Sequence, residues 1–138
     1  MKWLNAQKEF ESYFQGKDYF VFEFHDARIA KGTGGSNRIF TTSHPSDYIV
    51  VANGHTFFAE VKSSQEPVSF PFSNIKKSQW SAAKRTVCAK GSYFFFLKNE
   101  STKVWYKVPA QVLIAVLDLG VKSIRWDTLN TMLWRPML

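Results

Sequence analysis

Two carboxylates and one amine are spaced along residues 47–62 so that a β-hairpin would gather them. The turn is predicted at Asn53-Gly54, because both residue types tolerate the positive φ that a type I′ turn demands. A two-residue loop sets the register, so the two residue numbers of every facing pair add to the same total. The predicted facing pairs are Ala52 with His55, Val50 with Phe57, and Asp47 with Glu60.

Asp47 and Glu60 would therefore share one face of the hairpin with their Cβ atoms about 5 Å apart, where like charges are destabilising. Lys62 lies two residues beyond Glu60, so strand alternation returns it to the same face. A divalent cation between the acids would relieve their repulsion, and hard oxygen ligands suit Mg²⁺ or Mn²⁺. This is the donor set that a metal-dependent phosphodiesterase needs.

Hydrophobic periodicity and turn signals predict the elements that hold this hairpin. Ser73 is the predicted N-cap of a helix that runs to residue 90. The pattern indicates an α/β fold with a mixed central β-sheet flanked by helices. Helices are predicted over residues 3–15, 73–90 and 110–117 and after Asp127, and strands over residues 19–24, 47–52, 55–62, 92–97, 103–108 and 123–126.

Length and charge narrow the range of functions. A chain of 138 residues suits one domain, residues 1–138, with a proper core. The net charge of +7 favours a polyanionic partner such as nucleic acid. Cys88 is the only cysteine, and no apolar run is long enough to span a bilayer, so we expect a cytoplasmic protein with no membrane association.

The residues around the two acids resemble a known superfamily. Pro45-Ser46-Asp47, twelve intervening residues and then Glu60-Val61-Lys62 resemble the PD-(D/E)xK nuclease motif, with the proline displaced by one position. The segment from Ser69 to Ile75, followed by Gln79, resembles the RecU-type Holliday-junction resolvases and their phage-borne relatives. The resemblance covers roughly residues 8–108 and implies a restriction-endonuclease-like core.

The resemblance also implies roles for particular residues. Asp47 and Glu60 are expected metal ligands, with the Val61 carbonyl as a further oxygen, and Lys62 is expected to be catalytic. Gln79 would lie near the metal or the scissile phosphate, although an ordinary exposed helix residue is an equal alternative. The first helix of the family carries an acid that also serves the metal; Glu11 is our choice for it, and Glu9 is the reserve.

The expected function is that of a Mg²⁺-dependent endonuclease, with Mn²⁺ as a substitute, which resolves four-way DNA junctions in a bacterial or phage-infected cell. Resolvases of this type are dimers, and a two-fold homodimer would match the symmetry of the junction. The alternatives are a restriction-like or end-processing phage nuclease and a catalytically inactive DNA-binding module. The expected DNA contacts are Arg28, Lys31 and Arg38 in a long loop and Lys76, Lys77 and Arg85 on a helix.

Overall fold

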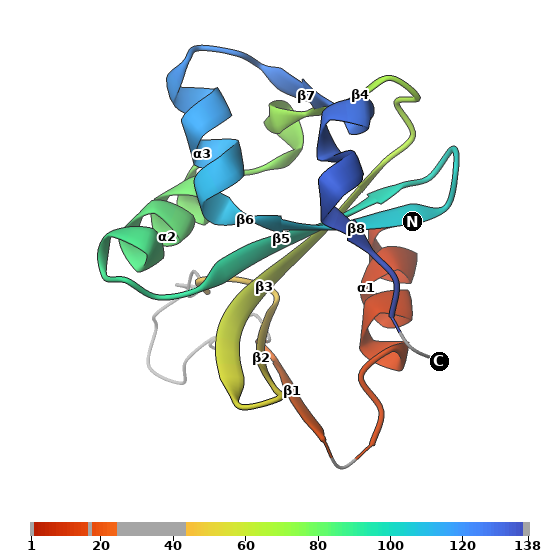
Figure 1. Ribbon diagram of the computed structural model, residues 1–138, viewed down its shortest axis with the longest axis vertical. Coiled ribbons are helices and arrows are strands. Elements are labelled where there is room, and N and C mark those ends of the chain that lie inside the picture. The colour runs from red at the N-terminus through yellow and green to blue at the C-terminus, as the bar shows by residue number, and fades with distance from the viewer. Residues whose placement is uncertain (1, 17, 25–43, 137–138) are drawn as a thin grey trace, which may run out of the picture.

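The computed structural model describes residues 2–16, 18–24 and 44–136. Its main sheet has six strands in the order β1-β2-β3-β5-β6-β8, and β4 and β7 form a separate two-stranded sheet (Figure 1). The β3–β5 pair is parallel and the other pairs are antiparallel, so the mixed sheet is confirmed. The elements are α1 (Lys2–Ser12), β1 (Tyr19–Glu23), β2 (Tyr48–Ala52), β3 (His55–Ser64), β4 (Ser69–Pro71), η1 (Phe72–Asn74), α2 (Lys77–Cys88), β5 (Tyr93–Asn99), β6 (Val104–Pro109), α3 (Ala110–Asp118), β7 (Ser123–Arg125), η2 (Trp126–Met132) and β8 (Leu133–Trp134).

The predicted hairpin is present as β2 and β3, in the predicted register. Ala52 pairs with His55 and Val50 pairs with Phe57. Asn53 and Gly54 form the turn with φ angles of 52° and 78°, the positive values that selected these residue types. Continuing the register one step past Tyr48 and Ala59 brings Asp47 opposite Glu60.

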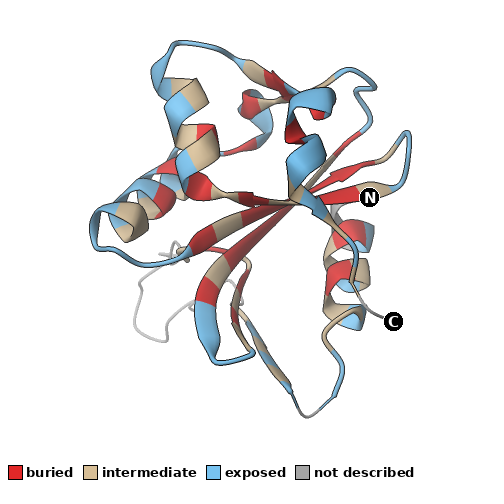
Figure 2. Ribbon diagram, viewed as in Figure 1, coloured by how far each residue is buried: buried red, intermediate tan, exposed pale blue. Residues whose placement is uncertain are grey.

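Each face of the sheet carries its own hydrophobic cluster. Phe10 of α1 packs on one face with Tyr48, Val61 and Phe96. On the other face, α2 and α3 cover β5 and β6, and the figures show these helices on the side opposite α1 (Figure 1). Buried residues run along β3, β5 and β6, whereas β1 at the sheet edge has none (Figure 2). The central strands are thus held between the two helical layers.

Two predictions about helices are wrong, one on where a helix begins and one on the type of helix. Ser73 is not a helix N-cap, because it lies in the 3₁₀ turn η1 and α2 begins only at Lys77. Ile75 adopts an extended conformation with φ −102° after η1, and it is buried in the core together with Phe72. The region after Asp127 is a 3₁₀ helix rather than an α-helix, and it leads into β8. No helix among the described residues is long and apolar enough to cross a membrane.

Glu9 anchors α1 to the sheet through polar contacts. Its carboxylate accepts hydrogen bonds from Lys98 Nζ and Trp105 Nε1, both at 2.6 Å, and from the Tyr13 hydroxyl at 2.9 Å. Burial alone raises the pKa of Glu9, but the hydrogen bonds from these three partners outweigh burial and lower the pKa below its usual 4.5. The Glu9 carboxylate therefore belongs to a structural hydrogen-bond network.

We expect Glu9→Gln to lower the free energy of unfolding at neutral pH by about 1–3 kcal/mol, because hydrogen bonds to a charged acceptor are lost. A lowered folded-state pKa stabilises the fold above the unfolded value and loses this effect as pH falls. The deficit of the variant should therefore shrink below pH 4.5. Urea unfolding across that range measures it, with Glu66→Gln on an exposed residue as the control. A deficit that is independent of pH would contradict this account.

Candidate active site

Asp47 and Glu60 form a carboxyl pair at the end of the hairpin, in which Glu60 is buried and Asp47 is half-buried. Glu60 is 1 % exposed, and the register of the hairpin sets the two carboxyl groups opposite each other. Burial and then the charge of Asp47 raise the pKa of Glu60 well above its usual value. Burial also raises the pKa of Asp47. Burial and the neighbouring carboxylate therefore both oppose ionisation of Glu60.

Backbone and side-chain donors orient Asp47. The Val61 N–H donates to Asp47 Oδ2 at 2.8 Å, which links the end of β2 to the middle of β3. The side chain of Gln7 on α1 lies beside Asp47 and lowers the pKa of Asp47, although less than burial raises it. The Asp47 carbonyl accepts from the Phe24 N–H at 2.9 Å, so the backbone at this position is held as well. Asp47 is thus preorganised by three different segments.

Lys62 and Gln79 complete the group around Glu60. Lys62 Nζ lies 3.5 Å from Glu60 Oε2, as the strand alternation predicts. Gln79 Nε2 donates to the same oxygen at 3.0 Å, while Gln79 Oε1 accepts from the Lys76 N–H at 2.8 Å. Gln79 therefore caps the N-terminus of α2 and reaches into the site at the same time. The structure brings together Asp47, directly before β2, with Glu60 and Lys62 of β3 and Gln79 of α2.

The two contacts of Gln79 can be separated by substitution. Gln79→Glu keeps the capping oxygen but cannot donate to Glu60, whereas Gln79→Ala loses both contacts. We expect both variants to lower the rate of DNA cleavage by roughly 10- to 100-fold, as is typical for partners of metal-binding side chains. Only Gln79→Ala should also lose about 1 kcal/mol of stability from the lost cap.

Single-turnover cleavage and thermal unfolding measure the two effects, with exposed Ser78→Ala as the neighbouring control. Cleavage by Gln79→Glu at the wild-type rate would show that the contact with Glu60 has no part in the reaction.

The structure places Glu11 apart from the carboxyl pair. Glu11 Oε1 accepts from the Tyr48 hydroxyl at 2.8 Å. Tyr48 packs in the cluster under α1, on the face opposite Asp47 and Glu60. Among the described residues no three His, Cys, Asp or Glu side chains are gathered as ligands for one metal ion, so Glu11 does not join Asp47 and Glu60 in such a group.

The sequence analysis did not single out two residues that the structure places at the site. Gln7 precedes Glu11 by one helical turn and lies beside Asp47, in the place where an acid was expected. Tyr93 on β5 donates its hydroxyl to the Pro45 carbonyl at 2.6 Å and lies near the pair, since burial and then the charges of Glu60 and Asp47 raise the pKa of Tyr93. A helical wheel centred on Glu11 would have indicated Gln7; nothing in the sequence marks Tyr93 beyond its place at the start of a buried strand.

The chemistry of the pair fits a hard divalent cation. Mg²⁺ is commonly held by one or two carboxylates, and water and substrate phosphate oxygens fill its remaining positions. Two neighbouring carboxyl groups with raised pKa values would both ionise against such a cation, because its charge offsets their repulsion and their desolvation. Asp47 and Glu60 would be the ligands from side chains, and no third carboxylate is required.

The predicted DNA-contacting residues fall into two sets. Lys76, Lys77 and Arg85 are exposed on α2 and at its N-cap, close to Gln79 in the chain. Arg28, Lys31 and Arg38 lie outside the described residues, so their prediction stays a prediction.

Comparison with known proteins agrees with this geometry. No curated protein matches the chain. Among solved structures, it is similar to Hjc, a Holliday junction resolvase from the archaeal hyperthermophile Archaeoglobus fulgidus, with a TM-score of 0.59 and 13% sequence identity over 94% of this chain and 93% of that one. At that identity the likeness shows a shared fold, which is the restriction-endonuclease-like fold of the PD-(D/E)xK nucleases. A family model described as recombination protein U matches residues 26–135, and the chain therefore belongs to this family of Holliday-junction resolvases.

Proposed function

We propose that this chain is a metal-dependent endonuclease that resolves Holliday junctions by hydrolysing phosphodiester bonds. The observation that carries the proposal is the Asp47–Glu60 pair, with Glu60 buried and with Lys62 Nζ at 3.5 Å and Gln79 Nε2 at 3.0 Å from one Glu60 oxygen. Membership of the recombination protein U family, with a fold shared with an archaeal resolvase, supports a four-way junction as the substrate. We treat residues 1–138 as one nuclease domain, because both hydrophobic clusters lie on the same sheet.

In this proposal Asp47 and Glu60 hold Mg²⁺, for which Mn²⁺ substitutes, and the Val61 carbonyl adds an oxygen. The bound cation would polarise the scissile phosphate and lower the pKa of an attacking water. Lys62 places its ammonium where negative charge develops and orients the water. Gln79 holds the Glu60 carboxylate in one orientation against the N-terminus of α2.

Glu11 takes a different part in the proposal from the one the resemblance implies. Its hydrogen bond to Tyr48 ties α1 to the first residue of β2, directly after Asp47. In the proposal Glu11 is thus a positioning residue, and Gln7 is the α1 residue that lies beside the proposed ligand Asp47.

DNA binding is proposed to be mainly electrostatic. The exposed Lys76 and Lys77 stand where α2 begins, and Arg85 lies farther along the same helix. Side chains of this kind contact phosphates without reading bases, which suits an enzyme that selects a DNA structure. The net charge of +7 supports the same conclusion. In the proposal, Arg28, Lys31 and Arg38, which lie outside the described residues, add to this set from the segment before Asp47.

We further propose that two copies pair through the edge strand β1. Phe20 and Phe22 project from its outer face and are 59% and 50% exposed. An edge strand with exposed aromatic side chains invites pairing with another strand, and the two-fold symmetry of a four-way junction calls for a second copy of this chain.

We expect the double variant Phe20→Ser with Phe22→Ser to be monomeric at concentrations where the natural chain is a dimer. It should nick one strand of a junction without the paired second cut. Sedimentation velocity measures the first effect, and Val68→Ser, which alters a side chain that is also 59% exposed, is the matched control. A dimer that survives both substitutions would place the interface elsewhere.

The substrate class is tested by comparing cleavage of a four-way junction, a flap, linear duplex and single-stranded DNA. We expect symmetrical cuts in the junction and little cleavage of linear duplex. Preference for linear duplex or for DNA ends would instead indicate a nuclease of the same fold with a different purpose, and binding without cleavage of any substrate would indicate an inactive DNA-binding module.

A further inference from the structure

An aromatic pocket lies on the face of the sheet opposite the carboxyl pair. The strand β3 has ten residues and α1 has eleven, so at about 3.3 Å and 1.5 Å per residue the strand extends well beyond the helix that packs on it. The uncovered part, near the Asn53-Gly54 turn, is a pocket of about 540 Å³. A volume of this order suits a small organic ligand.

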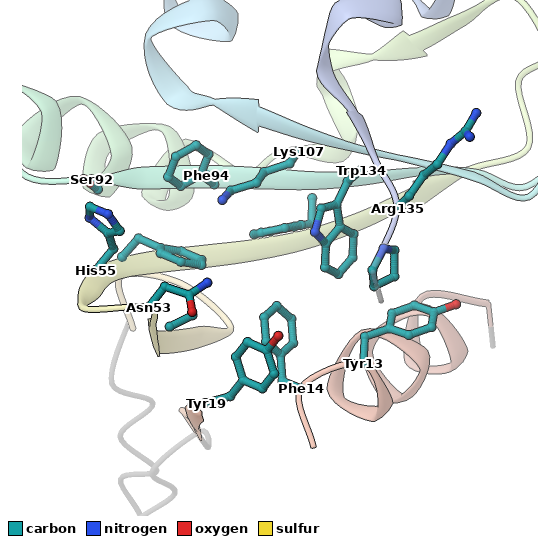
Figure 3. A pocket seen from close by; sticks show the side chains of 14 residues that line it. Tyr13, Phe14, Tyr19, Asn53, His55, Ser92, Phe94, Lys107, Trp134 and Arg135 are labelled. Carbon is teal, nitrogen blue, oxygen red and sulfur yellow. The ribbon is translucent and has the colours of Figure 1, made fainter. Parts of the chain in front are cut away.

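Rings form most of the wall of this pocket. Three rings face the pocket in Figure 3. Phe14 follows the end of α1, Tyr19 begins β1, and Trp134 belongs to β8. Phe57 and Phe94 line it from the sheet. Flat aromatic walls at several orientations favour a planar guest, because stacked and edge-on contacts with such a guest are both available.

A lysine and an amide bring polar groups to the same space. Lys107 Nζ lies over the rings of Phe57 and Phe94, 4.9 Å and 4.5 Å from their centroids. Among the described residues no carboxylate forms an ion pair with Lys107, and burial lowers the pKa of this lysine. Asn53 points into the pocket from the tip of the turn (Figure 3). A half-buried ammonium group that forms no ion pair with a carboxylate is stabilised strongly when an anionic ligand binds beside it.

We propose that this pocket binds an unstacked nucleotide of the DNA substrate, with the base against the aromatic rings and the phosphate at Lys107. Stacking on aromatic side chains next to a basic group is how proteins hold single-stranded nucleic acid. Asn53 offers a hydrogen-bond donor and an acceptor to the edge of the base. The inference rests on the proposed function for its substrate, because it takes DNA as the source of the nucleotide.

The pocket is separate from the proposed site of cleavage. Phe57 precedes Glu60 by three residues, about 10 Å along β3, and its side chain points to the opposite face of the sheet. The nucleotide bound there is therefore not the one that is cut. We infer that the pocket holds a displaced strand while the carboxyl pair acts on another phosphate.

The test compares two single-stranded DNAs of equal length, oligothymidylate and the same backbone without bases, by fluorescence anisotropy in EDTA. The natural chain should bind oligothymidylate roughly tenfold more tightly, since stacking favours the DNA that carries bases. Lys107→Met, which keeps the packing of the stem, should weaken binding to both DNAs by about fivefold or more. Lys122→Met removes the same charge from an exposed site outside the pocket and should leave binding nearly unchanged.

A second variant tests the pocket independently, in case Lys107→Met impairs folding. Asn53→Gly keeps the turn, because glycine readily adopts the φ of 52° found there, and it should reduce the preference for DNA with bases. Equal affinity of the natural chain for both DNAs would overturn the inference. So would equal effects of Lys107→Met and Lys122→Met, or a change of oligomeric state in Lys107→Met, which would indicate that a second copy covers the pocket.

These outcomes are distinguishable from failure of the proposed function. Base-dependent binding through Lys107 in a protein that cleaves no junction would support the pocket and refute the nuclease. Junction cleavage by a protein without base-dependent binding would refute the pocket alone.

Discussion

Replacing Glu60 by glutamine should abolish cleavage of four-way junctions and at the same time stabilise the protein. The loss of cleavage, about a thousandfold or more, follows because a neutral amide binds a divalent cation more weakly than a carboxylate and leaves Asp47 as the one charged ligand of the proposed site. The gain in stability follows from burial: Glu60 is 1 % exposed, and its raised pKa means that ionisation opposes folding.

The sign of the stability effect is set by proton linkage. A carboxyl group whose pKa is higher in the folded state loses stability as pH rises above the unfolded value of 4.5. Without metal at neutral pH, Glu60→Gln removes that cost, and a gain of about 1–2 kcal/mol is typical of substitutions that relieve a strained site. Thermal unfolding in EDTA measures the gain, with Glu66→Gln as the exposed control. A destabilised Glu60→Gln that still cleaves would refute both parts.

Lys62→Met should lower the single-turnover rate of cleavage by about 10²- to 10³-fold, the usual effect of removing one group that stabilises transition-state charge. Junction affinity should change little, because one ammonium is a small part of a surface with a net charge of +7. The methionine fills the same space beside Glu60, so the variant should fold normally.

Lys122→Met is the matched control for charge, since this lysine is exposed and distant in sequence from the hairpin. An equal loss of cleavage in both variants would mean that Lys62 acts through general electrostatics and not at the reacting phosphate. Loss of junction binding in Lys62→Met alone would assign Lys62 to DNA binding instead of catalysis.

The hairpin was predictable because its chemistry is local. Asn53-Gly54 determines the turn, the turn determines the register, and the register places Asp47 opposite Glu60 with Lys62 on the same face. No tertiary information enters that chain of reasoning. The mixed sheet followed from similar local signals, above all the aromatic run in β5, whose position at the centre of the sheet matches its burial on both faces.

The side chains that the helices bring to the site were harder to predict, because they depend on how each helix is rotated against the sheet. Hydrophobic spacing located α1 but could not decide which of Gln7, Glu9 and Glu11 would reach the carboxyl pair. The structure directs Glu9 to Lys98, Glu11 to Tyr48 and Gln7 to Asp47. Similarly, the contact between Gln79 and Glu60 depends on where α2 begins, and the Ser73 prediction misplaced that start by several residues.

Cleavage of a synthetic four-way junction by the natural chain and by Glu60→Gln, each with Mg²⁺ and with EDTA, tests the central claim most directly. The account predicts symmetrical cuts by the natural chain with Mg²⁺, none with EDTA, and none by the variant in either condition while both proteins bind the junction. Cleavage that persists in EDTA, or that survives in the variant, would contradict the assignment of the Asp47–Glu60 pair as the metal-binding centre.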